Sequence, residues 1–139
     1  LEGSRGAPAA CREVALPEGV SAAGAVGLSA ADDERLYVAW EHQVVALDRA
    51  AGATWHIAWR QGADLTAFRG IAALADGSLA VASSDGLALL AAAAGQPLSR
   101  VAAADAPRGM DPVAVAACGR WILVADRLNV RLLRFRVTR

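Results

Sequence analysis

The side chains best suited to metal binding or nucleophilic chemistry are few and widely spaced in this sequence. It contains two histidines, His42 and His56, and two cysteines, Cys11 and Cys118. The cysteines form no C-x-x-C or C-x-x-H pair, which is the spacing typical of structural zinc sites. The sequence also lacks a Gly-x-Ser-x-Gly motif, a phosphate-binding loop and a pair of catalytic carboxylates. These residue types and spacings favour a binding function over catalysis, and they predict neither a metal nor a cofactor.

Charge and hydropathy narrow the class of protein further. The chain of 139 residues is 55% hydrophobic and 20% charged, which is typical of a folded domain. It has 14 acidic and 14 basic residues, so no overall field attracts nucleic acid or an anionic membrane. The apolar run from Leu87 to Ala94 is far shorter than the roughly 18 residues that a membrane-spanning helix needs. We therefore expect a domain without a membrane span, located in the cytoplasm.

A repeat of 43 residues organises most of the sequence. LYVAW at Leu36 to Trp40 aligns with LAVAS at Leu79 to Ser83 and with ILVAD at Ile122 to Asp126, without a gap. Apolar runs alternate with polar or glycine-bearing turns, a pattern that predicts antiparallel strands in a meander. We expect four-stranded units over residues 26–59 and 69–102, a unit over 111–135 that lacks its outer strand, and an isolated outer strand over 11–16.

One segment has a competing interpretation. GLALLAAAAG at Gly86 to Gly95 is rich in Ala and Leu, and helix propensity alone favours a helix there. The segments that align with it, QVVALD and VRLLRF, alternate in polarity and are typical of strands. The repeat therefore favours a strand.

The repeat resembles the NHL family of β-propellers. The match is best in DPVAVAACGRWILVADRLNVRLLRF, where Asp126 is followed by Asn129 and Arg131 in the N-x-R signature. The resemblance covers residues 26–135, although Trp40 stands where the pattern has Asp. It implies an all-β propeller with four-stranded antiparallel blades, of which this chain supplies about three in a probable six-bladed ring. It also implies a non-enzymatic module that binds a protein or RNA partner, as part of a larger ubiquitin ligase or scaffold protein.

The ring has two ways to close. Propellers typically have about 4 to 8 blades, so three blades need completion. The chain begins with Leu and lacks a signal-peptide pattern, which favours a segment of a longer parent protein that supplies the remaining blades. The alternative is a homodimer, in which the strand expected at residues 11–16 pairs with the incomplete third blade of a second copy. In isolation we expect the chain to self-associate, and deletion of residues 1–16 to weaken that association.

One end of the propeller is expected to carry the binding residues. The turns between second and third strands lie on the same end as the connections between blades, and propeller ligands usually sit there. Arginine exposed beside an aromatic side chain suits recognition of protein or nucleic acid. The residues expected at this end are Trp40, Glu41, His42, Arg60, Asp64, Phe68, Ser83, Ser84, Asp85, Asp105, Arg108, Asp111, Asp126, Arg127 and Leu128.

A metal-dependent hydrolase is the alternative function. Six-bladed propellers of the gluconolactonase type hold a central metal with Glu, Asn and Asp, and Glu41, Asn129 and Asp126 have the matching types. Asn129 follows Asp126 within one turn, however, and Glu41 belongs to a different blade. The interaction module therefore remains our preferred prediction.

The repeat also predicts which residues are buried and which thiols are free. Val38, Val81 and Val124 occupy the centre of equivalent second strands, so we expect all three in the core. Cys11 would begin an outermost strand and Cys118 would follow an innermost one, which puts the two beyond disulfide reach. Both cysteines are therefore expected to remain reduced.

Overall fold

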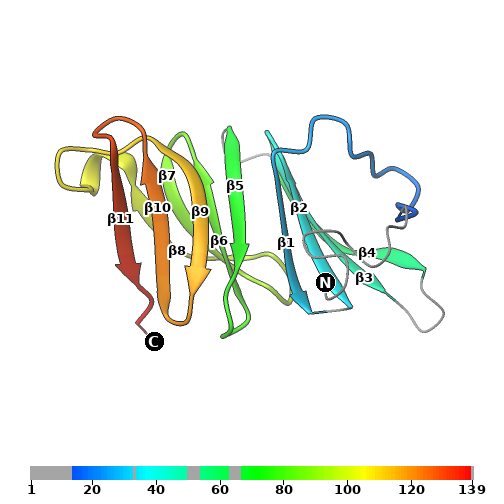
Figure 1. Ribbon diagram of the computed structural model, residues 1–139. Helices are drawn as coiled ribbons and strands as arrows, with labels where there is room; N and C mark the ends of the chain where they lie inside the picture. The colour runs from blue at the N-terminus through cyan, green and yellow to red at the C-terminus, as the bar shows by residue number, and fades with distance from the viewer. Residues whose placement is uncertain (1–13, 33, 50–53, 63–66, 139) are drawn as a thin grey trace, which may run out of the picture.

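The computed structural model describes residues 14–32, 34–49, 54–62 and 67–138. They form three antiparallel sheets that follow one another along the chain (Figure 1). Sheet 1 contains β1 (Gly27–Asp32), β2 (Arg35–Trp40), β3 (Gln43–Arg49) and β4 (Trp55–Gly62). Sheet 2 contains β5 (Phe68–Ala73), β6 (Ser78–Ser83), β7 (Gly86–Ala91) and β8 (Pro97–Ala102). Sheet 3 contains β9 (Pro112–Cys118), β10 (Trp121–Asp126) and β11 (Arg131–Arg136).

Within each sheet the strands pair in chain order, as a meander. The segment with the competing helical interpretation is strand β7, so the repeat predicted it correctly. One short 3-10 helix, Ala103–Asp105, lies between β8 and β9. None of the described segments forms a helix long and apolar enough to cross a membrane.

The expected outer strand at residues 11–16 is not seen in its described part. Val14 to Leu16 have no strand assignment, and residues 11–13 lie outside the described residues. Leu16 instead packs, together with Val20, against the first sheet.

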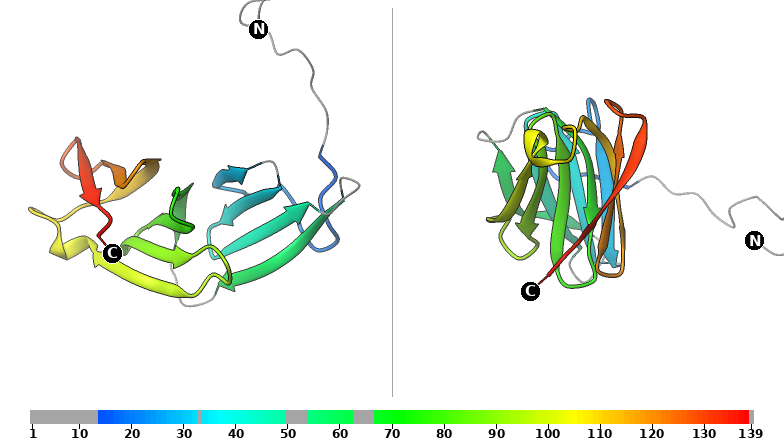
Figure 2. Two further views of the ribbon diagram at one scale, coloured as in Figure 1. Left: turned by 90° about the horizontal axis from the view of Figure 1, so that it is seen from below. Right: turned by 90° about the vertical axis from the view of Figure 1, so that its left-hand side faces the viewer.

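The sheets stack face against face along an arc, which Figure 2 shows from below. Sheets 1 and 2 enclose a core around Tyr37, Ile71 and Leu79, and sheets 2 and 3 enclose a second core around Met110 and Ile122. Burial of these apolar faces is the main force that holds the three sheets together. Strand β6 lies in the middle sheet and is buried along its whole length.

The three valines expected in the core are buried. Val81 and Val124 have no exposed surface, and Val38 is 8% exposed. Gly27 favours close contact between neighbouring sheets, because a Cβ there would lie only 3.1 Å from Cγ2 of Ile71. A hydrogen bond from the Ala73 amide to Oγ of Ser29, 2.9 Å long, also joins sheets 1 and 2.

Among the described residues, two sheet faces have no neighbouring sheet. The free face of sheet 1 carries Val38, Val45 and Leu47, and Leu16 and Val20 cover part of it. The opposite end of the arc is the end face of sheet 3, which consists of the outward-pointing residues Ala114, Ala116, Cys118, Trp121, Leu123, Ala125, Leu132, Arg134 and Arg136.

Candidate functional site: the loop face

One end of the sheet stack gathers the β2–β3, β6–β7 and β10–β11 turns and the connections between sheets. We call this end the loop face. Backbone hydrogen bonds join its neighbouring loops: Phe68 donates to the Glu41 carbonyl (2.8 Å), Ala103 to the Asp85 carbonyl (2.8 Å) and Arg127 to the Asp111 carbonyl (3.0 Å). The loop face is therefore a continuous, hydrogen-bonded surface across all three sheets.

Asp126 holds the part of the loop face that belongs to sheet 3. Its residue is 2% exposed, and both carboxylate oxygens accept two hydrogen bonds. Oδ1 accepts from the backbone amides of Asp111 (2.8 Å) and Leu128 (3.0 Å). Oδ2 accepts from Nδ2 of Asn129 (3.1 Å) and Nε of Arg131 (2.7 Å). Burial alone would raise the pKa of Asp126, but these four donors outweigh it and hold that pKa well below its usual range.

Asn129 and Arg131 extend this cluster to the connection between sheets 2 and 3. Asn129 Nδ2 donates to the Gly109 carbonyl at 3.1 Å, and Arg131 Nη2 donates to the same carbonyl at 2.8 Å. Arg131 also donates to the Pro107 carbonyl. We refer to Asp126, Asn129 and Arg131 as the Asp126 cluster. It joins the turn after β10 to the loop before β9 through hydrogen bonds.

Asp111 makes a second link on the loop face, between sheets. Its carboxylate accepts hydrogen bonds from Arg69 of sheet 2 and, at 2.9 Å, from Nε of Arg127 in the β10–β11 turn. The Arg69 hydrogen bond is the main reason that the pKa of Asp111 lies below its usual value, and Arg127 adds to the effect. Sequence reasoning missed Arg69 as a site residue, because it lies at the start of strand β5 rather than in a loop.

Several predicted site residues lie on the accessible part of the loop face. Glu41 and His42 have exposed side chains, 68% and 72% respectively, in the β2–β3 turn. Arg60 and Arg108 are exposed, and the Arg127 side chain is 67% exposed. Asp85 is exposed and lies 3.7 Å from Arg100. Asp105 is exposed as well, whereas Asp64 lies outside the described residues.

Other predicted site residues are not accessible. Phe68 is 2% exposed and belongs to the core between sheets 1 and 2. The prediction placed it in the loop before the strand, but strand β5 already begins at Phe68. Asp126 is buried as described above, and Ser83 is 5% exposed. Trp40 is half-buried, and its indole nitrogen donates to the carbonyls of Ser21 (3.0 Å) and Ala23 (3.2 Å). The Phe68 ring is therefore not accessible to a ligand on the loop face.

The most exposed apolar side chains of the loop face lie in the β10–β11 turn. Val130 is 92% exposed and Leu128 is 61% exposed. Val130 has φ of 52°, a left-handed conformation that is strained for a β-branched residue. Leu128 was expected at this end, but Val130 was assigned to the following strand and was missed. The turn after Asp126 is two residues longer than the β2–β3 turn, so a valine that the repeat places in β11 lies in the turn instead.

The residue set of the alternative hydrolase does not converge on an open position. Asp126 and Asn129 contact each other, but each carboxylate oxygen of Asp126 already accepts two hydrogen bonds, and one of the four donors is the Arg131 guanidinium. Glu41 lies in the turn of sheet 1 and is 3.8 Å from His42. His56 pairs with Asp48 in sheet 1, at the end opposite to His42. The cluster around Asp126 acts as a structural support for the loops.

Known proteins resemble this chain in structure but not in sequence. No protein-family model and no curated protein matches the sequence. The WD40 β-propeller domain of Doa1 superposes with a TM-score of 0.62 at 7% identity, over 81% of this chain and 37% of that chain. BamB from Moraxella catarrhalis gives a TM-score of 0.53 at 16% identity, over 77% of this chain and 34% of that chain. This chain is a partial β-propeller.

Each sheet is therefore a blade, and the all-β propeller prediction is confirmed. Hydrazine synthase from Kuenenia stuttgartiensis is a further structural neighbour, with a TM-score of 0.55 at 14% identity over 89% of this chain and 40% of that chain. This chain spans less than half the length of each of these neighbours. At such identities the likeness concerns the fold alone, and it does not distinguish NHL repeats from other propeller repeats.

Proposed function

We propose that this partial propeller is a non-enzymatic, NHL-like module that binds a protein partner through its loop face, as part of a larger scaffold. The observation that carries the proposal is the β10–β11 turn, in which Leu128 and Val130 are exposed beside the hydrogen-bonded Asp126 cluster. Exposed apolar side chains cost free energy, and a strained backbone costs more. A binding role gives a physical reason for both.

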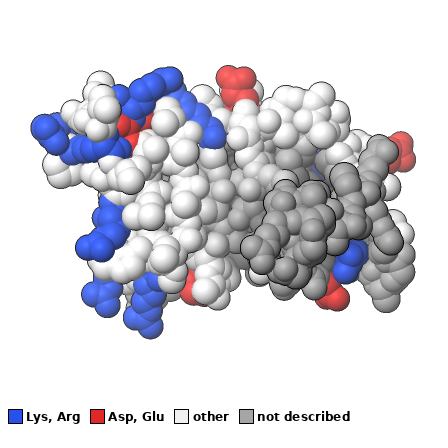
Figure 3. All heavy atoms as spheres, viewed as in Figure 1, with Lys and Arg blue, Asp and Glu red and all other residues white. Residues whose placement is uncertain are grey.

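The surroundings of the turn fit a protein interface. Arg127 precedes Leu128 in this turn, the Arg108 carbonyl accepts a hydrogen bond from Asn129, and both arginines are exposed. Basic side chains gather at this end of sheet 3 (Figure 3). Arginine is enriched in protein interfaces because its planar guanidinium makes several directed hydrogen bonds and packs on apolar surface. An apolar centre with a charged rim is the arrangement that protein interfaces share.

Protein is favoured over RNA by the lack of stacking surface. Recognition of single-stranded RNA relies on exposed aromatic side chains on which bases stack. Among the described residues of the loop face, no Phe, Tyr or Trp is fully exposed, since Phe68 is buried and Trp40 is half-buried.

Site-specific photo-crosslinking tests the proposal. A photoreactive amino acid at Val130 is expected to crosslink a defined protein in cell extract, whereas the same group at Leu98, which is 46% exposed on β8, is not. The captured protein is then purified and titrated by calorimetry against the unmodified chain and the Leu128→Ser variant. Binding that Leu128→Ser weakens about tenfold or more supports the proposal. Crosslinking to RNA at Val130, or equal protein binding by the variant, overturns it.

A further inference from the structure

The loops that meet at the β10–β11 turn carry more positive than negative charge. Their basic residues, together with the one at the start of β5 that pairs with them, are Arg69, Arg108, Arg127 and Arg131. Their acidic residues are Asp105, Asp111 and Asp126. Asp105 belongs to the 3-10 helix beside β7, and even when it is counted the basic groups are in excess. An anionic group on a partner would neutralise this excess.

Two of these carboxylates are already paired within the protein. Asp126 Oδ2 accepts from Nε of Arg131 at 2.7 Å. Asp111 accepts from both Arg69 and Arg127. Since one carboxylate serves two arginines at Asp111, the pairing leaves positive charge beside the β10–β11 turn.

Arg108 has no carboxylate partner of its own. It is exposed, and none of the ion pairs found among the described residues includes it. Its φ of 65° is left-handed, as is the φ of 52° at Val130. Asn129 connects the two strained positions, because its Nδ2 donates to the Arg108 carbonyl at 3.4 Å. Strained backbone of this kind clusters where proteins hold ligands.

Arg127 also retains donors for a ligand. Its Nε and Nη2 both lie 2.9 Å from Oδ2 of Asp111. A guanidinium carries several N–H donors, so pairing with a single oxygen uses only one edge of the group. Because the side chain is 67% exposed, the remaining donors are accessible to a partner.

Leu128 places an apolar side chain beside both arginines. It directly follows Arg127, and a Cβ built on Gly109 would lie 3.6 Å from Cδ2 of Leu128. Leu128 therefore lies against the backbone that follows Arg108. A ligand that satisfies all three residues needs an anionic group next to an apolar side chain.

The anionic group is better supplied by carboxylates than by phosphate. Guanidinium groups pair with either. The excess here is spread over two loops, which suits single carboxylates along a peptide. A phosphoryl group instead concentrates about two negative charges at one point.

We propose that the segment bound by the loop face is an acidic peptide, whose Asp or Glu carboxylates pair with Arg108 and Arg127 and whose neighbouring apolar side chain packs on Leu128. This inference rests on the loop-face binding proposed above and names the chemistry of the partner. Because the contacts are exposed charges, the affinity should fall as salt is added.

Selection of random peptides tests this chemistry. Peptides displayed on phage are selected on the immobilised full chain, and the enriched ones are synthesised with a fluorescent label. Fluorescence anisotropy then compares each peptide with an analogue in which Asp and Glu are replaced by Asn and Gln. We expect acidic peptides to be enriched and their amide analogues to bind about tenfold or more weakly. Enrichment of neutral or basic peptides, no enrichment, or equal binding of the analogues overturns the inference.

Charge reversal in the protein locates the contact. Arg108→Glu and Arg127→Glu should each weaken binding of the acidic peptides about tenfold or more. Arg108→Glu keeps the test valid if Arg127→Glu disturbs the fold, because Arg108 makes no ion pair among the described residues. A thermal melt of each variant checks folding.

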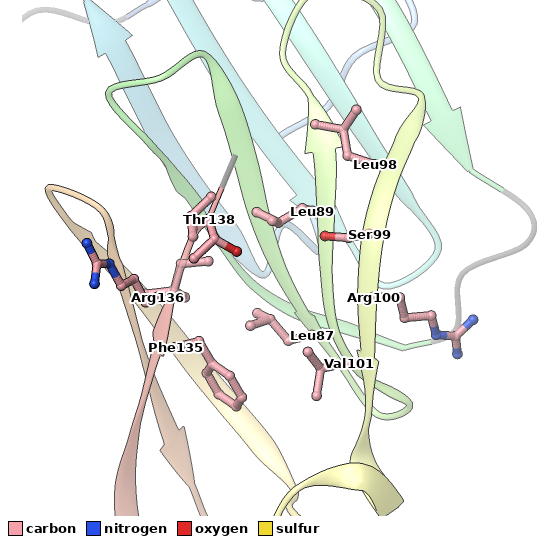
Figure 4. A pocket seen from close by; sticks show the side chains of 11 residues that line it. Leu87, Leu89, Leu98, Ser99, Arg100, Val101, Phe135, Arg136 and Thr138 are labelled. Carbon is pink, nitrogen blue, oxygen red and sulfur yellow. The ribbon is translucent and has the colours of Figure 1, made fainter.

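Arg136→Glu is the matched control and also tests a competing site. It makes the same charge change at the opposite end of β11, where Arg136 lines a pocket of about 360 Å³ between β11 and the outer strands of sheet 2 (Figure 4). Binding should be unchanged in this variant. A loss equal to or larger than that of Arg108→Glu would place the peptide in this pocket and overturn the inference.

The two proposals fail in different ways. A protein crosslinked at Val130 through a neutral or basic segment would leave loop-face binding standing and overturn the acidic partner. Peptide binding that neither Arg108→Glu nor Leu128→Ser weakens would overturn both.

Discussion

Asp126 has every carboxylate lone pair directed at a donor, and this makes the stability of the loop face dependent on pH. The folded-state pKa values of Asp126 and Asp111 lie below those of the unfolded chain, about 3.9 for Asp. Their stabilisation is therefore fully present above the unfolded pKa and is lost as pH falls through the folded values. We expect the melting temperature to fall steadily below about pH 5.

The Asp126→Ala variant tests whether Asp126 causes the loss of stability at low pH. At neutral pH it should melt about 5 °C or more below the unmodified chain, because Arg131 and Asn129 lose their acceptor. Its melting temperature should also depend less on pH between about 2 and 5. Asp105→Ala, an exposed acidic residue of the 3-10 helix, serves as the control. An unchanged pH profile in Asp126→Ala would assign the acid sensitivity elsewhere.

Val130 should show opposite effects on stability and binding. Its φ of 52° is disfavoured for valine but is readily adopted by asparagine. Val130→Asn should therefore raise the free energy of unfolding by about 1 kcal/mol in urea titration. The same change removes the apolar side chain that we place at the partner interface, so partner binding should weaken. A destabilised Val130→Asn variant would contradict the strain.

Val81 tests the double-sided burial of β6. It has no exposed surface, and both faces of its strand contact a neighbouring sheet. Val81→Ala should lower the free energy of unfolding by roughly 1 to 3 kcal/mol, through lost apolar transfer and the cavity that remains. Val26→Ala, at a residue 43% exposed, should cost less than about 0.5 kcal/mol.

At the scale of elements, the β7–β8 turn of sheet 2 is hydrogen-bonded to sheet 1. The Ala92 carbonyl, in the β7–β8 turn, accepts hydrogen bonds from Trp59 Nε1 (2.8 Å) and Arg35 Nη1 (2.9 Å) of sheet 1. Gly95 in the same turn has φ of 77°, and a Cβ there would lie 2.6 Å from the Trp59 ring. The turn therefore fits under the indole only because residue 95 has no side chain.

Two glycine substitutions separate the indole contact from backbone strain. Gly95→Ala and Gly77→Ala both place alanine at positive φ, but a Cβ at Gly77 meets nothing within 4 Å. Backbone strain should lower the free energy of unfolding by about 1 kcal/mol in both variants. Overpacking against Trp59 should lower it by roughly 1 to 3 kcal/mol more in Gly95→Ala. Chemical denaturation measures the difference. Equal losses in the two variants would show that the turn yields without disturbing Trp59.

The repeat was sufficient to predict the strands but not how the chain enters and leaves them. It identified β7 against its helical propensity, because QVVALD and VRLLRF constrain the same position. It failed at Val14 to Leu16, which have no strand assignment and pack on sheet 1 instead. Strand pairing is a tertiary property, so an isolated segment with the right pattern does not form a strand alone.

The loop face was predictable as a location but not in its details. The topology alone placed Glu41, His42 and Arg108 there. The burial of Phe68 and the four hydrogen bonds to the Asp126 carboxylate depend on side-chain packing, and a repeat alignment carries no information about packing. Asn129 and Arg131 were visible only as a repeat signature, and their role as a support became clear from their shared acceptors Asp126 and Gly109.

At the scale of the whole molecule, stability should decrease from the middle sheet toward both ends of the arc. Sheet 2 is covered on both faces, whereas sheets 1 and 3 each have a face without a neighbouring sheet. Stacked repeats gain most of their stability from contacts with neighbours. Hydrogen exchange should therefore be slowest in β6, and faster in β10 and β11. Uniform protection across the three sheets would mean that they open as one unit.

The position of the tryptophans gives the two ends of the arc different optical properties. Trp40, Trp55 and Trp59 all belong to sheet 1, and Trp121 is the only tryptophan of sheet 3. Arg134 and Arg136 lie over the Trp121 ring, where indole emission responds to nearby charge and to water. Fluorescence that is lost in Trp121→Phe therefore reports on the end face of sheet 3 alone. The molecule therefore carries an intrinsic spectroscopic label at one end of the arc.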